Sequence, residues 1–107
     1  MDGIIPSGGS RDYYDAVTEK IPDVHDFYRL FEVPGLGHCF GGNGGSPKTI
    51  FDAMRAWVEN GTVPDTLPIS FQHENQIKQN RILCPYPQKA IFNGVGDGHL
   101  AESFYCA

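Results

Sequence analysis

Residues 27–40 read FYRLFEVPGLGHCF, an apolar run that leads into a glycine-rich stretch carrying His38. The run from Phe27 to Val33 ends at Pro34, a pattern typical of a strand buried on both faces, as in a parallel sheet. His38 would then lie on the loop after a buried strand, where rigid scaffolds present functional side chains. Because an imidazole with a pKa of about 6.5 can accept a proton and return it, His38 is a candidate general base. A histidine held in a turn by backbone hydrogen bonds would give the same local pattern.

Two helices flank this stretch. The first is predicted from Ser10, a suitable N-cap, to about Lys20, and Pro22 stops it. The second is predicted to begin at Ser46-Pro47, a capping residue followed by proline, and to end at Asn60-Gly61. The order of helix, buried strand, histidine loop and helix predicts an α/β fold.

The second helix carries an apolar stripe formed by Ile50, Met54, Trp57 and Val58. A stripe of this kind should pack on a sheet. Because most of that sheet would lie outside these 107 residues, the chain should expose apolar surface and tend to associate. Trp57 and the aromatic residues at 27, 28 and 31 are expected in the core.

Beyond Gly61 the pattern changes. Prolines at positions 64, 68, 85 and 87 and a polar patch from 72 to 81 leave room only for short extended pieces such as Leu67–Phe71. The residues after Gly61 are therefore predicted to form an irregular tail that packs on the surface of a larger protein body. Within it, residues 93–99 (NGVGDGH) look like a calcium loop, but one acidic residue and no regular ligand spacing favour a tight turn. The histidines expected at the surface or in turns are His25, His73 and His99.

Composition excludes several classes of function. One compact domain at most fits 107 residues, and a net charge of −5 with scattered basic residues argues against a nucleic-acid-binding face. No run approaches the roughly 18 apolar residues of a membrane helix, and residues 1–6 (MDGIIP) lack the pattern of a signal peptide. Phe40 stands where a dinucleotide fingerprint beginning at Gly35 needs its third glycine. The histidines and cysteines show no Cys-x-x-Cys or His-x-x-x-His spacing, so no metal site is predicted.

Three cysteines, Cys39, Cys84 and Cys106, are an odd number. In an oxidised protein at least one is therefore free or paired outside this chain. Three single pairings are possible within the chain, and spacing alone does not select one. Asn60-Gly61-Thr62 satisfies the N-glycosylation sequon, which is typical of a secreted surface loop but also arises by chance.

Five stretches of the chain follow one another in a familiar order and spacing: residues 2–6 (DGIIP), 10–14 (SRDYY), 33–42 (VPGLGHCFGG), 56–61 (AWVENG) and 81–87 (RILCPYP). Together they resemble the tannase and feruloyl esterase family, and the likeness covers nearly the whole chain. The family consists of secreted α/β-hydrolase serine esterases with a separate lid domain. The resemblance implies that residues 1–107 are the C-terminal segment of a single α/β-hydrolase catalytic domain.

The resemblance also implies roles for individual residues. It makes His38 the catalytic base and Asp2 the carboxylate that orients it, in the chain order of α/β-hydrolases. Taken alone, Asp2-Gly3 would be interpreted as a turn. Cys84 and Cys106 match the family's C-terminal disulfide, worth roughly 3 kcal/mol in the chain-entropy model. Cys39 matches a cysteine bonded to one that precedes the nucleophilic serine, outside this chain.

The family's nucleophile has no counterpart in this sequence. That serine lies in a Cys-Ser-x-Gly-Gly element, and no serine here has that context. The lid domain with its calcium site would also be missing, so no cofactor is expected in this segment.

By resemblance the protein is a secreted carboxylic ester hydrolase that cleaves feruloyl or galloyl esters by a Ser-His-Asp acyl-enzyme mechanism. Its expected partners are a small aromatic-acid ester or a plant polysaccharide or tannin ester, and the missing N-terminal part of the same enzyme. Neither a nucleic acid nor a membrane is expected as a partner, and the isolated chain should be inactive. The alternative is a noncatalytic module of hydrolase ancestry, either truncated or a secreted binding module.

Overall fold

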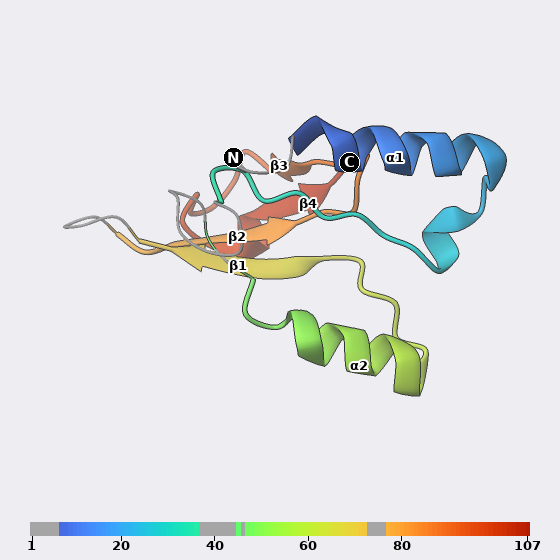
Figure 1. The fold of residues 1–107 in the computed structure, drawn as a ribbon. Coiled ribbons are helices and arrows are strands. Elements are labelled where there is room, and N and C mark those ends of the chain that lie inside the picture. The colour runs from blue at the N-terminus through green and yellow to red at the C-terminus, as the bar shows by residue number, and fades with distance from the viewer. Residues whose placement is uncertain (1–6, 37–44, 46, 73–76) are drawn as a thin grey trace.

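The computed structural model describes residues 7–36, 45, 47–72 and 77–107. Helix α1 spans Ser7–Lys20, a short 3-10 turn (η1) spans Val24–Asp26, and helix α2 spans Ile50–Asn60. The two helices lie on opposite sides of the strands, with α1 above them and α2 below in Figure 1. The radius of gyration is 14.9 Å, against about 13 Å expected for a compact domain of this length. The chain is therefore more open than an independent domain of its size.

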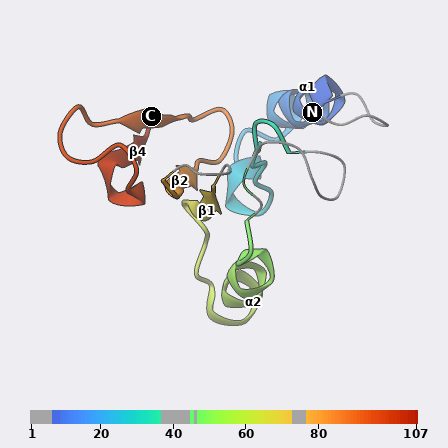
Figure 2. The same cartoon turned by 90° about the vertical axis from the view of Figure 1, so that its left-hand side faces the viewer.

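Four strands form two small antiparallel sheets. Strand β1 (Leu67–Phe71) pairs with β2 (Gln79–Leu83), with Leu67 opposite Leu83. Strand β3 (Ala90–Phe92) pairs with β4 (Phe104–Cys106), which follows the 3-10 turn η2 (Ala101–Ser103). The quarter turn in Figure 2 places β4 beside β2, on the side away from β1.

Helix α1 confirms the first predicted helix, with a correction at its start. It ends at Lys20 as expected but begins three residues before Ser10, so Ser10 lies inside the helix and does not cap it. One side chain of this helix is deeply buried: Tyr14 is 3% exposed. The helix therefore attaches to the rest of the chain around Tyr14.

The prediction of a doubly buried parallel strand over Phe27–Val33 is wrong. Phe31 alone in this run forms a β-bridge, antiparallel to Pro85, and Phe27 is 60% exposed. The amides of Phe27 and Tyr28 both donate to the carbonyl of Val24 and so belong to the end of η1. A strand buried on both faces needs other elements to cover each face, and among the described residues Phe27 is left uncovered. The predicted α/β fold would contain parallel strands. The two sheets among the described residues are both antiparallel.

Helix α2 begins later than predicted and ends as predicted. Thr49 precedes its first residue and makes no side-chain capping bond, while the expected cap, Ser46, lies outside the described residues. Gly61 adopts the left-handed conformation with φ of 69°, and its amide donates to the carbonyl of Trp57 at 3.1 Å. A glycine at this position ends the helix without the strain a Cβ would bring.

The described residues include only part of the sheet packing that was expected for α2. Ala53 packs against the small core cluster of Leu67, Ile69 and Leu83, and Trp57 is half-buried. Four larger side chains remain between 50% and 76% exposed: Ile50, Phe51, Met54 and Val58. The predicted exposure of apolar surface is thereby confirmed.

The tail after Gly61 is more regular than predicted. Strand β1 has the expected bounds, but β2 begins inside the polar patch 72–81 that was expected to be irregular and continues two residues beyond it. Pairing across the sheet explains the polar strand, since each β2 residue faces a β1 residue and the Ser70 hydroxyl donates to Oδ1 of Asn80 at 2.9 Å. No helix among the described residues is long and apolar enough to span a membrane.

The segment 93–99 forms the tight turns that its composition predicts. The side-chain oxygen of Asn93 accepts from the amide of Val95, and that of Asp97 accepts from the amide of His99, both at 2.9 Å. His99 and His25 both lie in turns and are half-buried, and His73 lies outside the described residues.

Candidate functional site

The residues to which the resemblance gives chemical roles, Asp2, His38 and Cys39, lie outside the described residues. The structure describes the two elements that lead to them. Helix α1 begins five residues after Asp2, and the segment 27–36 ends two residues before His38. How these two elements are held together is therefore the part of the candidate site that the structure defines.

A bidentate ion pair joins the two elements. Nε and Nη2 of Arg11, on α1, donate to the two carboxylate oxygens of Glu32 at 3.0 and 2.9 Å. The Arg11 guanidinium also lies over the ring of Tyr86, 5.5 Å from its centroid. The hydrogen bond and charge of Glu32 raise the pKa of Arg11 above its ordinary value. This planar arrangement fixes orientation as well as distance.

Three tyrosines form a second contact between α1 and the segment 27–36. The hydroxyl of Tyr14 donates to the backbone carbonyl of Tyr28 at 3.2 Å. The ring of Tyr14 meets those of Tyr28 and Tyr86 edge-on, with centroids 5.1 and 5.8 Å apart. Burial raises the pKa of Tyr14 above its ordinary value. The tyrosine cluster packs α1 onto both the segment 27–36 and the stretch after β2, which is residues 84–87.

The stretch after β2 holds the segment 27–36 from another side. The amide of Tyr86 donates to the carbonyl of Leu30 at 2.7 Å, and Pro85 forms the bridge with Phe31. The Tyr86 hydroxyl donates to Asp15 of α1 at 3.1 Å, and burial first, then this hydrogen bond, raises its pKa. Tyr86 thus contacts both elements at once.

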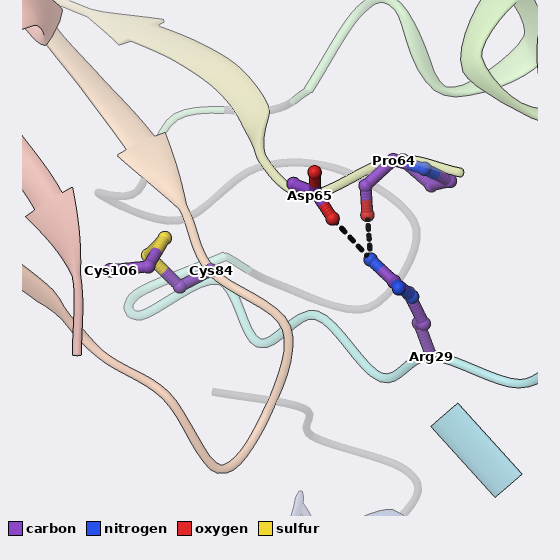
Figure 3. The surroundings of a disulfide bond; sticks show 5 residues. All are labelled: Arg29, Pro64, Asp65, Cys84 and Cys106. Atoms are coloured by element: carbon purple, nitrogen blue, oxygen red, sulfur yellow. Dashed lines mark hydrogen bonds and ion pairs between the residues drawn. A yellow bond between two sulfur atoms is a disulfide. The ribbon is translucent and has the colours of Figure 1, made fainter. Parts of the chain in front are cut away.

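A disulfide ties the same stretch to the C-terminal strand. Cys84 and Cys106 are bonded to each other, which confirms the pairing that the resemblance implies. Cys84 immediately precedes Pro85 and Tyr86, so the bond links their position to β4 (Figure 3). Cys39 takes no part in this bond, and its expected partner outside the chain stays a prediction.

Arg29 anchors the segment 27–36 toward α2. Its side chain is 9% exposed, and its Nη1 donates to the carbonyl of Pro64 at 2.7 Å and to Asp65 at 2.9 Å (Figure 3). Its Nε donates to the carbonyl of His25 at 3.1 Å, and the guanidinium lies 5.9 Å from the ring centroid of Trp57. One buried cation therefore fixes this segment relative to the loop that follows α2.

A cavity of about 490 Å³ opens between these elements. Pro34, three residues before the undescribed stretch 37–44, and Gly45, directly after it, both line this cavity. Its wall is mainly apolar, from Ile69, Phe71 and Leu83, with the charged side chains Glu32, Arg81 and Lys89 also contributing. Its volume falls in the usual range of small-molecule pockets, about 300–1,000 Å³.

Several of these anchoring roles were not predicted from the sequence. Arg11 and Tyr86 lie in stretches that carry the family resemblance, but nothing local marks them as contacts of each other. Arg29 carried a usable signal, because an arginine inside an apolar run is rarely buried without partners. Gly45 was hidden in a stretch with many glycines.

Two further expectations concern bound groups. Asn60, in the glycosylation sequon, is the exposed last residue of α2. Among the described residues there is no group of three or more His, Cys, Asp or Glu side chains that could hold a metal ion.

Comparison with known proteins decides the family. Residues 1–107 match the family described as tannase and feruloyl esterase. The chain belongs to this family. Among solved structures, an esterase from Aspergillus oryzae matches with a TM-score of 0.82 and 27% identity, over 100% of this chain and 25% of that protein. A tannin acyl hydrolase from Aspergillus niger matches with a TM-score of 0.75 and 30% identity, over 99% of this chain and 21% of that protein.

Curated proteins are also similar in sequence. The mono(2-hydroxyethyl) terephthalate hydrolase of Piscinibacter sakaiensis is 37% identical over 99 residues, which is 90% of this chain and 16% of that protein. A probable feruloyl esterase of Arthroderma benhamiae is 34% identical over 113 residues, 99% of this chain and 21% of that protein. The chain thus spans about a sixth to a quarter of the length of the relatives that it matches. All four are named as hydrolases or esterases.

Proposed function

We propose that this chain is part of a carboxylic ester hydrolase of the α/β-hydrolase type, in which His38 is the general base and Asp2 orients it. The observation that carries the proposal is the family match over residues 1–107, which includes both positions. The contacts of Arg11, Tyr14 and Tyr86 support it, because they join the element after Asp2 to the segment before His38. The nucleophilic serine would come from residues outside this chain.

The proposed chemistry is acyl transfer in two steps. The serine oxygen attacks the ester carbonyl while His38 takes its proton, and His38 then gives that proton to the leaving alcohol. Water attacks the resulting acyl-enzyme, and His38 moves the water's proton to the serine oxygen as the acid departs. The Asp2 carboxylate would stabilise the imidazolium in both steps.

The substrate class we propose is an ester of an aromatic acid, feruloyl or galloyl. The names of the relatives support it, since feruloyl esterase, tannin acyl hydrolase and mono(2-hydroxyethyl) terephthalate hydrolase all denote aromatic-acid esters. The proposed location is extracellular. The Cys84–Cys106 disulfide supports that location, because such bonds persist in oxidising compartments.

The test is a graft. The segment of the Aspergillus oryzae esterase that this chain matches would be replaced by residues 1–107, and the product assayed on methyl ferulate and methyl gallate. Hydrolysis that disappears in His38→Ala and falls strongly in Asp2→Asn supports the proposal. A graft with the melting behaviour of the parent enzyme but no hydrolysis would overturn it.

The isolated chain provides the second arm. It should hydrolyse neither ester, because the serine is missing. Hydrolysis by the isolated chain that is lost in His38→Ala would mean that a serine of this chain is the nucleophile. A well-folded graft without activity would favour the noncatalytic module.

A further inference from the structure

We propose that the cavity of about 490 Å³ lined by Ile69, Phe71, Arg81, Leu83 and Lys89 binds a small aromatic carboxylate. These five residues all belong to the described part of the chain. The choice of ligand rests on the proposed function, because hydrolysis of an aromatic-acid ester releases an acid of this class. The proposal goes beyond that function because it assigns the cavity to the anionic product, whereas the ester group of the substrate carries no charge.

One face of the β1–β2 pair forms the floor of the cavity. In an antiparallel pair, residues directly opposite each other share a face, and so do alternate residues along each strand. Ile69 lies opposite Arg81, Phe71 is two residues after Ile69, and Leu83 is two residues after Arg81. Ile69 and Leu83 are 8% and 5% exposed. The floor is therefore a packed apolar surface that carries one cation, and an aromatic ring placed on it would leave water.

Two cations of the cavity wall are available to a ligand. The Arg81 guanidinium lies over the Phe104 ring, 4.5 Å from its centroid, and its Nη1 donates to the carbonyl of Asn80 at 3.1 Å. These contacts hold the guanidinium in place and leave it further N–H donors. The backbone of Lys89 exchanges hydrogen bonds of 2.8 and 3.0 Å with Ala107. Within the described ranges, neither Arg81 nor Lys89 has a carboxylate partner.

The remaining charged group of the described wall is already compensated. Both carboxylate oxygens of Glu32 accept hydrogen bonds from Arg11. The cavity therefore has a local surplus of positive charge in a chain whose net charge is −5. A carboxylate would form charge-assisted hydrogen bonds with the two cations, which a neutral ligand of the same shape cannot do. The combination of an apolar floor and two cations thus favours an organic anion with a ring.

The experiment is an NMR titration of the full 107-residue chain with ferulate at neutral pH. Ferulate should bind with a dissociation constant of about 1 mM, which is typical of a ligand of its size. Methyl ferulate keeps the ring without the charge, and acetate keeps the charge without the ring. Each should bind about tenfold more weakly. The amide signals of Leu83, Lys89 and Ala90 should move during the titration, and those of α1 should not.

Variants test the two cations separately. Arg81→Gln should weaken ferulate binding by about tenfold, and Arg81→Lys should keep part of the affinity because it keeps the charge. Lys89→Gln should weaken binding by about threefold, since an exposed ion pair contributes less. Lys89→Gln leaves the backbone bonds to Ala107 intact, so it tests the site even if Arg81→Gln lowers stability through the lost ring contact. The matched controls are Arg55→Gln and Lys78→Gln, at positions outside the cavity wall, and both should bind ferulate as the wild type does.

Three results would overturn the proposal. Ferulate and methyl ferulate binding equally well would mean that the cavity does not recognise the carboxylate. Acetate binding as tightly as ferulate would mean that the apolar floor takes no part. Equal affinities for ferulate in the wild type, Arg81→Gln and Lys89→Gln, or equal losses in the two control variants, would show that the two cations do not form the site.

This test is independent of catalysis because binding of the acid requires no hydrolysis. A graft without activity, together with an isolated chain that binds ferulate, would overturn the proposed function and leave the acid site standing. An active graft, together with an isolated chain that does not bind ferulate, would overturn the acid site alone. In an active graft, ferulate should inhibit hydrolysis, and Arg81→Gln should relieve that inhibition.

Discussion

Gly45 lies against the backbone of Ser70: a Cβ added to Gly45 would be 2.9 Å from the Ser70 carbonyl oxygen and 3.2 Å from the Phe71 ring. Gly45 is buried and directly follows the stretch 37–44. The close approach therefore fixes Gly45, the first described residue after the stretch 37–44, against β1.

Gly45→Ala should destabilise the chain by about 1–3 kcal/mol, the usual cost of overpacking a tight site. The obstructing atom is a backbone oxygen, which cannot rotate away as a flexible side chain would. Urea denaturation measures the change. Gly9→Ala is the matched control, because a Cβ there has no neighbour within 4 Å and the residue is helical. Equal stability of Gly45→Ala and the wild type would contradict this account of the contact.

Arg29→Ala should destabilise the chain by about 1–3 kcal/mol, because it leaves the half-buried carbonyls of His25 and Pro64 without this donor. Asp65→Asn should cost far less, about 0–1 kcal/mol, since Asp65 is 89% exposed. Trp57, the single tryptophan, should change its fluorescence in Arg29→Ala. Comparable losses in Arg29→Ala and Asp65→Asn would mean that the ion pair, and not the two carbonyl contacts, is the important interaction.

The elements that the sequence predicted correctly are those with local signals. Lys20 precedes a helix-stopping proline, Gly61 supplies a left-handed C-cap, and β1 lies between turn residues. Each signal acts within a few residues of the structure it specifies. The disulfide was available only through the family resemblance, because spacing left three pairings open.

The errors lie where distant residues decide the structure. The composition of residues 27–33 does not show whether this run pairs with one neighbour or with two. In the structure its pairing is set by Pro85 and Tyr86, which contact Phe31 and Leu30. The polar strand β2 exists because β1 pairs with it. Likewise, the contacts of Arg11 and Arg29 reach residues 21 and 36 positions away. Such partners cannot be read from periodicity.

Alkaline pH should weaken the chain through Tyr14. Burial raises the pKa of Tyr14 above its ordinary value of about 10. Below that pH the phenol is neutral in folded and unfolded chains alike, and its stabilisation is fully present. As pH rises toward the folded pKa, the unfolded chain ionises first and the free energy of unfolding falls. Urea midpoints at about pH 8 and about pH 10.5 measure the fall.

Tyr14→Phe tests the source of this pH dependence. It removes the titrating group and the hydrogen bond to Tyr28, so the variant should be less stable at neutral pH and lose less on going to high pH. Tyr13→Phe, at a neighbouring position that is 63% exposed, serves as the control and should behave as the wild type. A wild-type pH dependence in Tyr14→Phe would exclude Tyr14 as the cause.

The exposed stripe of α2 should drive self-association of the isolated chain. Phe51 and Val58 are 71% and 76% exposed, so the double variant Phe51→Glu and Val58→Lys should change stability by no more than about 0.5 kcal/mol. Sedimentation velocity should show weaker association than in the wild type. Ala53→Glu is the contrasting variant, because Ala53 packs on the core cluster and its substitution should destabilise the chain. Unchanged association in the double variant would mean that a different surface of the chain drives self-association.

Removing the disulfide with Cys84→Ser and Cys106→Ser should cost about 3 kcal/mol, as expected for a bridge between residues 22 positions apart. The loss should be greatest near the bond, where Lys89 and Ala107 exchange two backbone hydrogen bonds of 2.8 and 3.0 Å. Hydrogen exchange at both amides should therefore accelerate more than at the β1–β2 pair. Cys39→Ser is the control: it removes a cysteine, leaves this bond intact and should keep the wild-type urea midpoint. A wild-type urea midpoint in the Cys84→Ser and Cys106→Ser variant would contradict a stabilising role for this bond.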